Sequence, residues 1–470
     1  MTMLVVLIFY LVMFPRVLTR LNPLTGDEPF YVMTAISLLR DHDLNEANNY
    51  QLQQYDAFYP PDPLPANWQG WPSFPRPLPP HPAISRVPGL HTKHGLGLTF
   101  LIAIPYAIGG RIGADALVML CAILLSGQMY LLARESGAAP ELALLIAIGL
   151  AITMPLGPYA FLIFPEIPAA LLLIYAVRRL GATANTPLQW LVAGSAIGFL
   201  PWLHQRFGLT AAVLTAWMFL RAWQNPSRRL VAVGLAPVAA GGIALLLYNH
   251  WLYHSLIENT HDHAGFNHLA GTVNGAMGLL LDAQWGLWMV APITLIALAA
   301  VPRWYQRAPR LVVVAISAVV PYFALVAAYK VWWGEWGPAA RYLVPVVPFA
   351  AGSLAAYLQR ANVIGRCLTA AVWGFGLILS LIGYVNPQRF YDQPDGINHL
   401  YAHLGRVLHL HPERWLVAFE PYALAPFPER LGISLLALTL LLVVILAVNS
   451  TALLAKESPE EFTRTNRKQG

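Results

Sequence analysis

Two adjacent carboxylates, Asp27 and Glu28, are the first residues in the sequence whose types and spacing could do chemistry. They lie in Gly26-Asp27-Glu28-Pro29, after a long apolar segment and before a helical pattern. A carboxylate can take the proton of an acceptor hydroxyl as a general base, while its neighbour orients it or holds a cation. The alternative is a capping pair at a helix N-terminus, where the helix dipole favours acids. Both interpretations stay open from the residues alone.

A second polar motif, His91-Thr92-Lys93-His94, lies directly before a glycine-rich apolar segment. Lysine binds phosphate as a point charge, and nearby glycines allow a phosphate to approach backbone N–H groups. The motif therefore predicts a phosphate site at Lys93 and His94. The alternative is an interfacial lysine that marks a helix end.

Polar residues also occur where apolar segments end. Glu166 stands between two prolines, and His204 and Arg206 stand in a short polar turn. An ionisable group at the bilayer centre costs about 3 kcal/mol, so such groups tend to face a cavity or a partner. Glu166, His204 and Arg206 are therefore candidates for residues that line a cavity or contact a bound partner. The structural alternative is a Glu166–Arg206 salt bridge.

Trp332-Trp333-Gly334-Glu335-Trp336 precedes Arg341-Tyr342. Tryptophans are common at membrane interfaces, but this spacing beside an acid could also form a stacking platform for a sugar ring. The sugar-binding candidates here are Trp333, Glu335 and Arg341.

Metal binding is left undecided by the sequence. His261 and His263 flank Asp262 and could provide ligands, but a solvated polar loop is the favoured interpretation of this spacing. Both cysteines, Cys121 and Cys367, fall within apolar segments, so the polar loops contain no thiolate site.

Composition identifies the elements that must position these residues. The chain of 470 residues is 57% hydrophobic and 11% charged, whereas soluble domains are roughly a quarter charged. Apolar runs of about 20 residues recur along it, as membrane-spanning helices require, and the predicted spans include 285–302, 341–358 and 431–455. Its net charge of +6 is scattered over short loops, which excludes a nucleic-acid-binding surface. We predict an all-α polytopic membrane protein.

Arginine-rich short loops are expected to be cytoplasmic, which places the His-, Trp- and acid-rich connections outside. Residues 95–113 fit this alternation only as a re-entrant or outer-leaflet helix that does not cross, leaving about twelve crossings (roughly 11–13). We expect the active face to be extracytoplasmic, in the plasma (inner) membrane. The predicted organisation is a transmembrane domain over 1–455, a long first external loop over 22–94 with short amphipathic helices, further external loops over 251–284 and 386–430, and a cytoplasmic tail over 456–470.

The opening motif resembles the first external loop of GT-C glycosyltransferases, which include protein O-mannosyltransferases and lipid A aminoarabinose transferases. The resemblance rests on Gly26-Asp27-Glu28-Pro29-Phe30-Tyr31, on Lys93-His94-Gly95-Leu96-Gly97-Leu98, and on the Trp332–Trp336 motif with Arg341-Tyr342-Leu343-Val344-Pro345. It covers the layout from the first span to about residue 350, although the family places prolines where His94-Gly95 follow the lysine here.

The resemblance implies an inverting transfer of sugar from a polyprenyl-phosphate donor to a hydroxyl of a lipid, glycan or protein acceptor. Asp27 would be the general base, and Glu28 would position the acceptor or a divalent metal. Lys93 and His94, with Arg206, would bind the donor phosphate. Glu166 and His204 would be candidates for contact with the sugar or the acceptor. The alternatives are a transporter or flippase of lipid-linked sugars, whose paths also contain broken helices, and a non-catalytic membrane assembly subunit.

Overall fold

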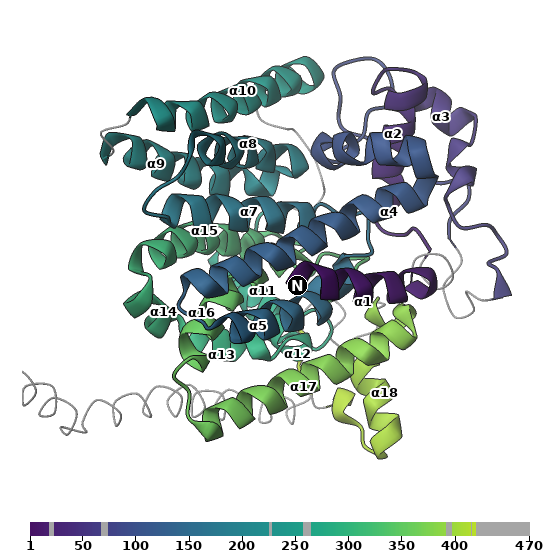
Figure 1. Ribbon diagram of the computed structural model, residues 1–470. Coiled ribbons are helices and arrows are strands. Elements are labelled where there is room, and N and C mark those ends of the chain that lie inside the picture. The colour runs from purple at the N-terminus through teal and green to yellow at the C-terminus, as the bar shows by residue number, and fades with distance from the viewer. Residues whose placement is uncertain are drawn as a thin grey trace, which may run out of the picture.

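The computed structural model describes residues 1–17, 23–66, 74–224, 228–256, 265–391, 397–414 and 416–419, which form helices joined by loops. The longer helices run roughly alongside one another (Figure 1). They are α1 (Thr2–Arg16), α2 (Glu28–Arg40), α3 (Ala47–Gln51), α4 (Leu96–Glu135), α5 (Pro140–Ile152), α6 (Leu156–Tyr159), α7 (Glu166–Gly181), α8 (Pro187–Leu203), α9 (Gly208–Gln224), α10 (Arg228–Tyr253), α11 (Leu269–Leu281), α12 (Leu287–Val290), α13 (Ile293–Ala299), α14 (Val301–Arg307), α15 (Pro309–Ala328), α16 (Ala350–Leu358), α17 (Val363–Val385) and α18 (His399–Leu408).

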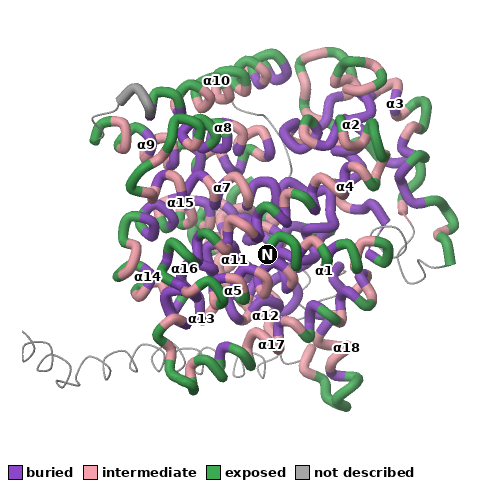
Figure 2. The backbone as a smooth tube through the Cα atoms, viewed as in Figure 1, coloured by how far each residue is buried: buried purple, intermediate pink, exposed green. Residues whose placement is uncertain are grey.

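The outer helices expose apolar side chains, as a chain surrounded by lipid requires. On α10, Ile243, Leu246 and Leu247 are all exposed, and Figure 2 shows exposed residues along both α10 and α17. Four helical stretches of the described chain are long and apolar enough to cross a membrane: Leu96–Glu135, Val231–Tyr253, Pro309–Ala328 and Val363–Val385. The predicted all-α polytopic class is confirmed, whereas the number of crossings stays a prediction.

Helix α4 is two helices joined by a sharp reversal at Gly110. That residue has φ 57° and ψ −143°, outside helical values. A Cβ on Gly113 would lie 2.0 Å from the carbonyl oxygen of Pro105, although eight residues of straight helix span about 12 Å. The chain therefore folds back after residue 109, so the predicted separation of 95–113 from the following span is correct. Its re-entry into the membrane stays a prediction.

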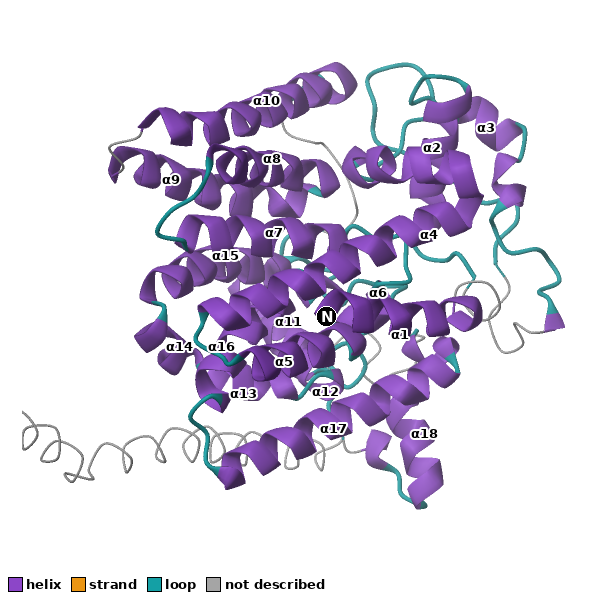
Figure 3. Ribbon diagram, in the orientation of Figure 1, coloured by secondary structure: helices purple, strands orange, loops and turns teal. Residues whose placement is uncertain are grey.

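The first loop forms one end of the helix bundle. Figure 1 shows α2 and α3, in purple, at the right of the view, and Figure 3 shows long loops around them. The expected short helices are present, but α2 is not amphipathic over its first turns, since every residue from Glu28 to Ser37 is buried. The loop is thus a packed layer that covers the bundle end.

Several predicted segments differ from the structure. A hydropathy average shows neither a helix within a polar loop nor the point where a proline breaks an apolar helix. The predicted loop 251–284 contains α11, which packs against α15. The predicted spans 285–302 and 341–358 are broken: the first into α12, α13 and α14, the second into two 3₁₀ turns before α16. Prolines at 292, 302, 345 and 348 remove backbone donors at these breaks. The predicted span 431–455, the tail 456–470, and His261, Asp262 and His263 lie outside the described residues.

Candidate functional site

Four charged side chains from distant parts of the sequence form a continuous network beneath the first loop. Arg341 pairs through Nη2 with Oδ2 of Asp27 and donates through Nε to Oε1 of Glu166 at 3.0 Å. The same Glu166 oxygen accepts from Nη2 of Arg206 at 2.7 Å. Arg341 also donates to the carbonyl of Gly334 at 2.9 Å. The predicted Glu166–Arg206 salt bridge is therefore present, and it is extended by Arg341 to Asp27.

Exposure is graded along this network. The Glu166 side chain is 0% exposed, and those of Arg341 and Arg206 are 7% and 9% exposed. Aromatic rings cover the guanidiniums. The Cζ atom of Arg341 lies 4.3 Å from the ring centroid of Phe164, and that of Arg206 lies 4.6 Å from the ring centroid of Tyr342. Two acids balance two arginines, so the network is neutral. Such pairing is what makes the burial of these charges tolerable.

Asp27 is the exposed end of the network, with a side chain that is 26% exposed. It precedes α2 but makes no side-chain capping bond, so the capping alternative does not describe it. The position of Asp27 depends on the preceding Gly26. The φ of Gly26 is +59°, and a Cβ on this residue would lie 2.5 Å from the carbonyl oxygen of Trp336. Burial acts to raise the pKa of Asp27, but the charge and hydrogen bond of Arg341, together with the nearby His94 and His81, outweigh burial and lower that pKa below its usual range.

Glu28, unlike its neighbour Asp27, is completely buried. Its two oxygens accept backbone N–H bonds, one from Ile163 at 2.8 Å and one from Thr25 at 3.1 Å. Burial raises its pKa to about 8, although the charge of Arg111 opposes this. This geometry does not support the predicted role of Glu28 in holding an acceptor or a metal, because both oxygens are already engaged with the backbone. Glu28 instead ties the start of α2 to the segment before α7.

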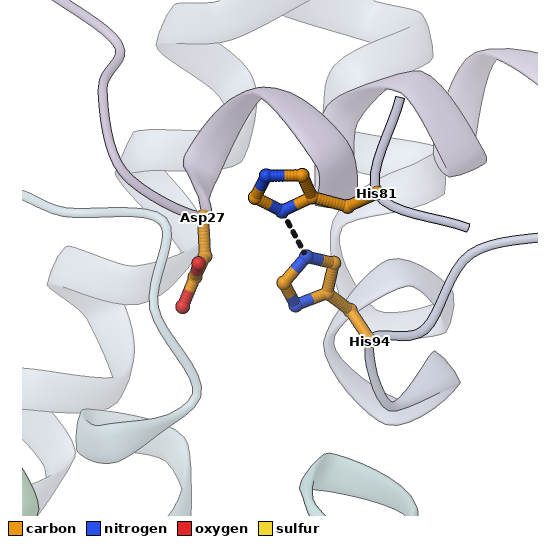
Figure 4. Close-up of side chains that lie close together, drawn as sticks. All are labelled: Asp27, His81 and His94. Carbon is orange, nitrogen blue, oxygen red and sulfur yellow. Dashed lines mark hydrogen bonds between the residues drawn. The ribbon is translucent and has the colours of Figure 1, made fainter. Parts of the chain in front are cut away.

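Two histidines lie beside Asp27 (Figure 4). Nδ1 of His81 is 3.3 Å from Nε2 of His94, and one ligand atom from each of Asp27, His81 and His94 lies within 4.8 Å of the others. The ring of Phe30 stacks on His81 at 3.7 Å and on His94 at 5.4 Å. Burial lowers the pKa of His94 to about 4, with the charge of Asp27 opposing. His94 is therefore neutral near pH 7.

Backbone contacts bring these histidines together. An isolated antiparallel bridge joins Pro82 to Thr92, and the amide of Lys93 donates to the carbonyl of His81 at 3.0 Å. Beyond the bridge, glycines at 95 and 97 lie against the last turn of α8. A Cβ on Gly95 would lie 2.6 Å from the carbonyl oxygen of Leu203. The glycines that suggested a phosphate cradle therefore serve close backbone packing between α4 and α8.

The other predicted residues lie around this region with different exposures. His204 ends α8, and its Nδ1 accepts from the backbone amide of Arg206 at 3.2 Å. Lys93 is half-buried beside His94. Trp332 is buried against α11, so the predicted platform of three tryptophans is reduced to the half-buried Trp333 and to Trp336. Glu335 is exposed, with φ 49°.

Sequence reasoning missed His81 and Phe30 as parts of the site. His81 stands in a proline-rich run, Pro79-Pro80-His81-Pro82, where neither periodicity nor a motif distinguishes it. One signal existed: the three prolines around His81 restrict the backbone at little entropic cost. Such a restricted backbone suits a segment that must hold a side chain in one position.

Comparison with known proteins adds evidence at the level of the fold. No protein-family model matches the chain, and no curated protein matches it in sequence. Two solved structures of ArnT from Cupriavidus metallidurans are similar. The structure bound to undecaprenyl phosphate has a TM-score of 0.51 at 14% identity, covering 95% of this chain and 73% of that chain. The apo structure has a TM-score of 0.48 at 13% identity, covering 81% and 68%. The chain therefore shares its fold with the ArnT that has undecaprenyl phosphate bound, which agrees with the fold that the resemblance in sequence implies.

Proposed function

We propose that this protein is a GT-C-type glycosyltransferase that moves a sugar from a polyprenyl-phosphate donor to an acceptor hydroxyl at the outer face of the plasma (inner) membrane. Asp27 acts as the general base. The observation that carries the proposal is the exposure of Asp27 at the end of an otherwise buried charge network. The structure of ArnT with undecaprenyl phosphate bound supports the donor class, since the two chains share a fold.

The reaction is a single displacement. The acceptor oxygen forms a bond to the anomeric carbon while the bond from that carbon to the donor phosphate breaks, and the electron pair stays on the phosphate. Asp27 takes the hydroxyl proton. Because the acceptor attacks the face opposite the phosphate, the configuration inverts, as in the inverting glycosidases.

Arg341 links the base to the leaving group. While it pairs with Asp27, the low pKa of the carboxyl makes it a weak proton acceptor. A donor phosphate that draws the guanidinium toward itself would raise the basicity of Asp27 at the moment of attack. The phosphate charge that develops on bond cleavage would be stabilised by the same guanidinium. This coupling explains why a base and a cation are placed in contact.

Lys93 is the second proposed phosphate ligand, since it is half-buried and its charge acts on the neighbouring His94 beside Asp27. Arg206, which the sequence assigned to the phosphate, has its guanidinium on Glu166 and against Tyr342. We therefore give Arg206 a supporting role, in which it holds Glu166 and through it Arg341.

The test uses the full-length protein in proteoliposomes with a panel of undecaprenyl-phosphate sugars, and measures release of undecaprenyl phosphate. Asp27→Asn is expected to slow release by about 10²–10⁴-fold, the contribution of a general base. Asp56→Asn is the matched control, because Asp56 is a first-loop carboxylate whose side chain is 49% exposed and paired with Arg76. Full activity of Asp27→Asn, or sugar flux across the membrane without release, would overturn the proposal in favour of a structural or transport role.

A further inference from the structure

We propose that Asp27, His81 and His94 form a binding site for a divalent transition-metal ion of the zinc class. Each residue contributes one ligand atom, and a fourth position remains open to water or to an acceptor hydroxyl. Three protein ligands and one open position are typical of reactive rather than structural zinc sites. The site rests on the proposed function only for the identity of that hydroxyl, because metal binding itself needs no sugar donor.

The spacing of the imidazoles fits a tetrahedral ion. Zinc–nitrogen bonds of about 2.0–2.1 Å at tetrahedral angles separate two nitrogens by roughly 3.3 Å. The two nitrogens in the structure, Nδ1 of His81 and Nε2 of His94, are 3.3 Å apart. The ligand atoms of all three residues lie within 4.8 Å of one another, so a rotation of the Asp27 side chain would bring its carboxylate to the third position of a tetrahedral site.

The ligand types and their support agree with this geometry. Imidazole and carboxylate together suit zinc better than magnesium or calcium, which prefer oxygen. Phe30 holds both rings by stacking, and the bridge between Pro82 and Thr92 fixes their backbones.

Arg341 limits how the ion can bind. Its guanidinium is already on Oδ2 of Asp27, which leaves Oδ1 for the ion, so the carboxylate would bridge two cations. Glu166 compensates by binding the other side of Arg341 at 3.0 Å. An ion on Asp27 would lower the basicity of that carboxylate and, at the same time, make a hydroxyl bound in the open position more acidic.

The binding test uses full-length protein without a histidine tag, stripped of metal with a chelator and then titrated with Zn²⁺ alone. Bound metal is counted by mass spectrometry, and affinity is measured by competition with a chromophoric chelator. About one zinc per chain is expected, with affinity reduced at least ~10-fold in His81→Ala and in His94→Ala. His42→Asn is the matched control: His42 is an exposed histidine of the same loop, with φ 59°, a backbone conformation that asparagine tolerates.

Cobalt provides a second measurement that depends on no variant. Co²⁺ bound to the wild-type chain should give the visible absorption of a four-coordinate ion, and Zn²⁺ should displace it. Absence of stoichiometric zinc binding, binding unchanged in both histidine variants, or loss of binding in His42→Asn would each overturn the inference. Zinc binding in a protein that transfers no sugar would leave the site standing and refute only the proposed transfer.

Discussion

Replacing Glu166 should cost more stability than replacing Asp27, whereas replacing Asp27 should cost more activity. Glu166→Gln removes the carboxylate whose single oxygen accepts from Arg206 at 2.7 Å and from Arg341 at 3.0 Å. Two buried guanidiniums would then share only the charge of Asp27. Removing one partner of a buried ion pair costs about 3–5 kcal/mol. Asp27→Asn leaves Arg341 bound to Glu166 and to Gly334, and a more exposed pair contributes about 1 kcal/mol or less.

These free energies convert to measurable melting shifts. An unfolding entropy of about 2.1 cal/mol/K per residue gives roughly 1 kcal/mol/K for this chain. Glu166→Gln should therefore lower the melting temperature by about 3–5 °C and Asp27→Asn by about 1 °C, whereas the loss of transfer activity should be larger in Asp27→Asn. Thermal denaturation followed by size-exclusion chromatography in detergent measures the first quantity, and release of undecaprenyl phosphate measures the second.

A double variant tests the charge argument itself. Arg206→Met removes the cation that Glu166→Gln leaves uncompensated, so the double variant should be more stable than the sum of the two single effects predicts. Coupling between residues in one network is about 0.5–3 kcal/mol. Additive effects, or equal destabilisation by Glu166→Gln and Asp27→Asn, would refute the view that the more buried ion pairs of the network contribute more to stability.

Two further changes probe how the site is held. Gly26→Ala should lower the melting temperature by several degrees and reduce activity, because φ is +59° there and a Cβ would lie 2.5 Å from the carbonyl oxygen of Trp336. Gly208→Ala is the control and should leave both quantities unchanged, because a Cβ there would meet no atom within 4 Å. Equal effects of the two substitutions would contradict the packing argument. Glu28→Gln should flatten the pH dependence of stability. The folded pKa of about 8 lies above the usual 4.5, so the folded chain keeps a proton that the unfolded chain releases, and the free energy of unfolding falls by about 1.4 kcal/mol per pH unit between these values. Melting curves from about pH 5 to pH 8 measure this, and an unchanged slope in the variant would exclude Glu28 as the source.

The sequence predicted the class of the fold and singled out the four residues of the charge network. It did not predict most of the contacts that those residues make. Run length and charge content predict membrane helices from local information, and the Glu166–Arg206 pair followed from the cost of burying either charge alone. The link from Arg341 to Asp27 could not be predicted, because nothing local relates residues 314 positions apart. The role of Glu28 was also hidden, since its partners are backbone amides, which every residue has. His81 was missed because a proline-rich segment has no periodicity that shows where it packs.

The separation of the four charges along the chain gives their assembly an order during synthesis. Glu166 and Arg206 are 40 residues apart, whereas Arg341 follows Glu166 by 175 residues. At about 5–20 residues per second, Arg341 is made roughly 9–35 s after Glu166. Glu166 and Arg206 can therefore neutralise each other as a pair while the later helices are still being inserted. Asp27, made first, gains its partner Arg341 only after the other three charges have been made, so the Asp27 end of the network is completed last.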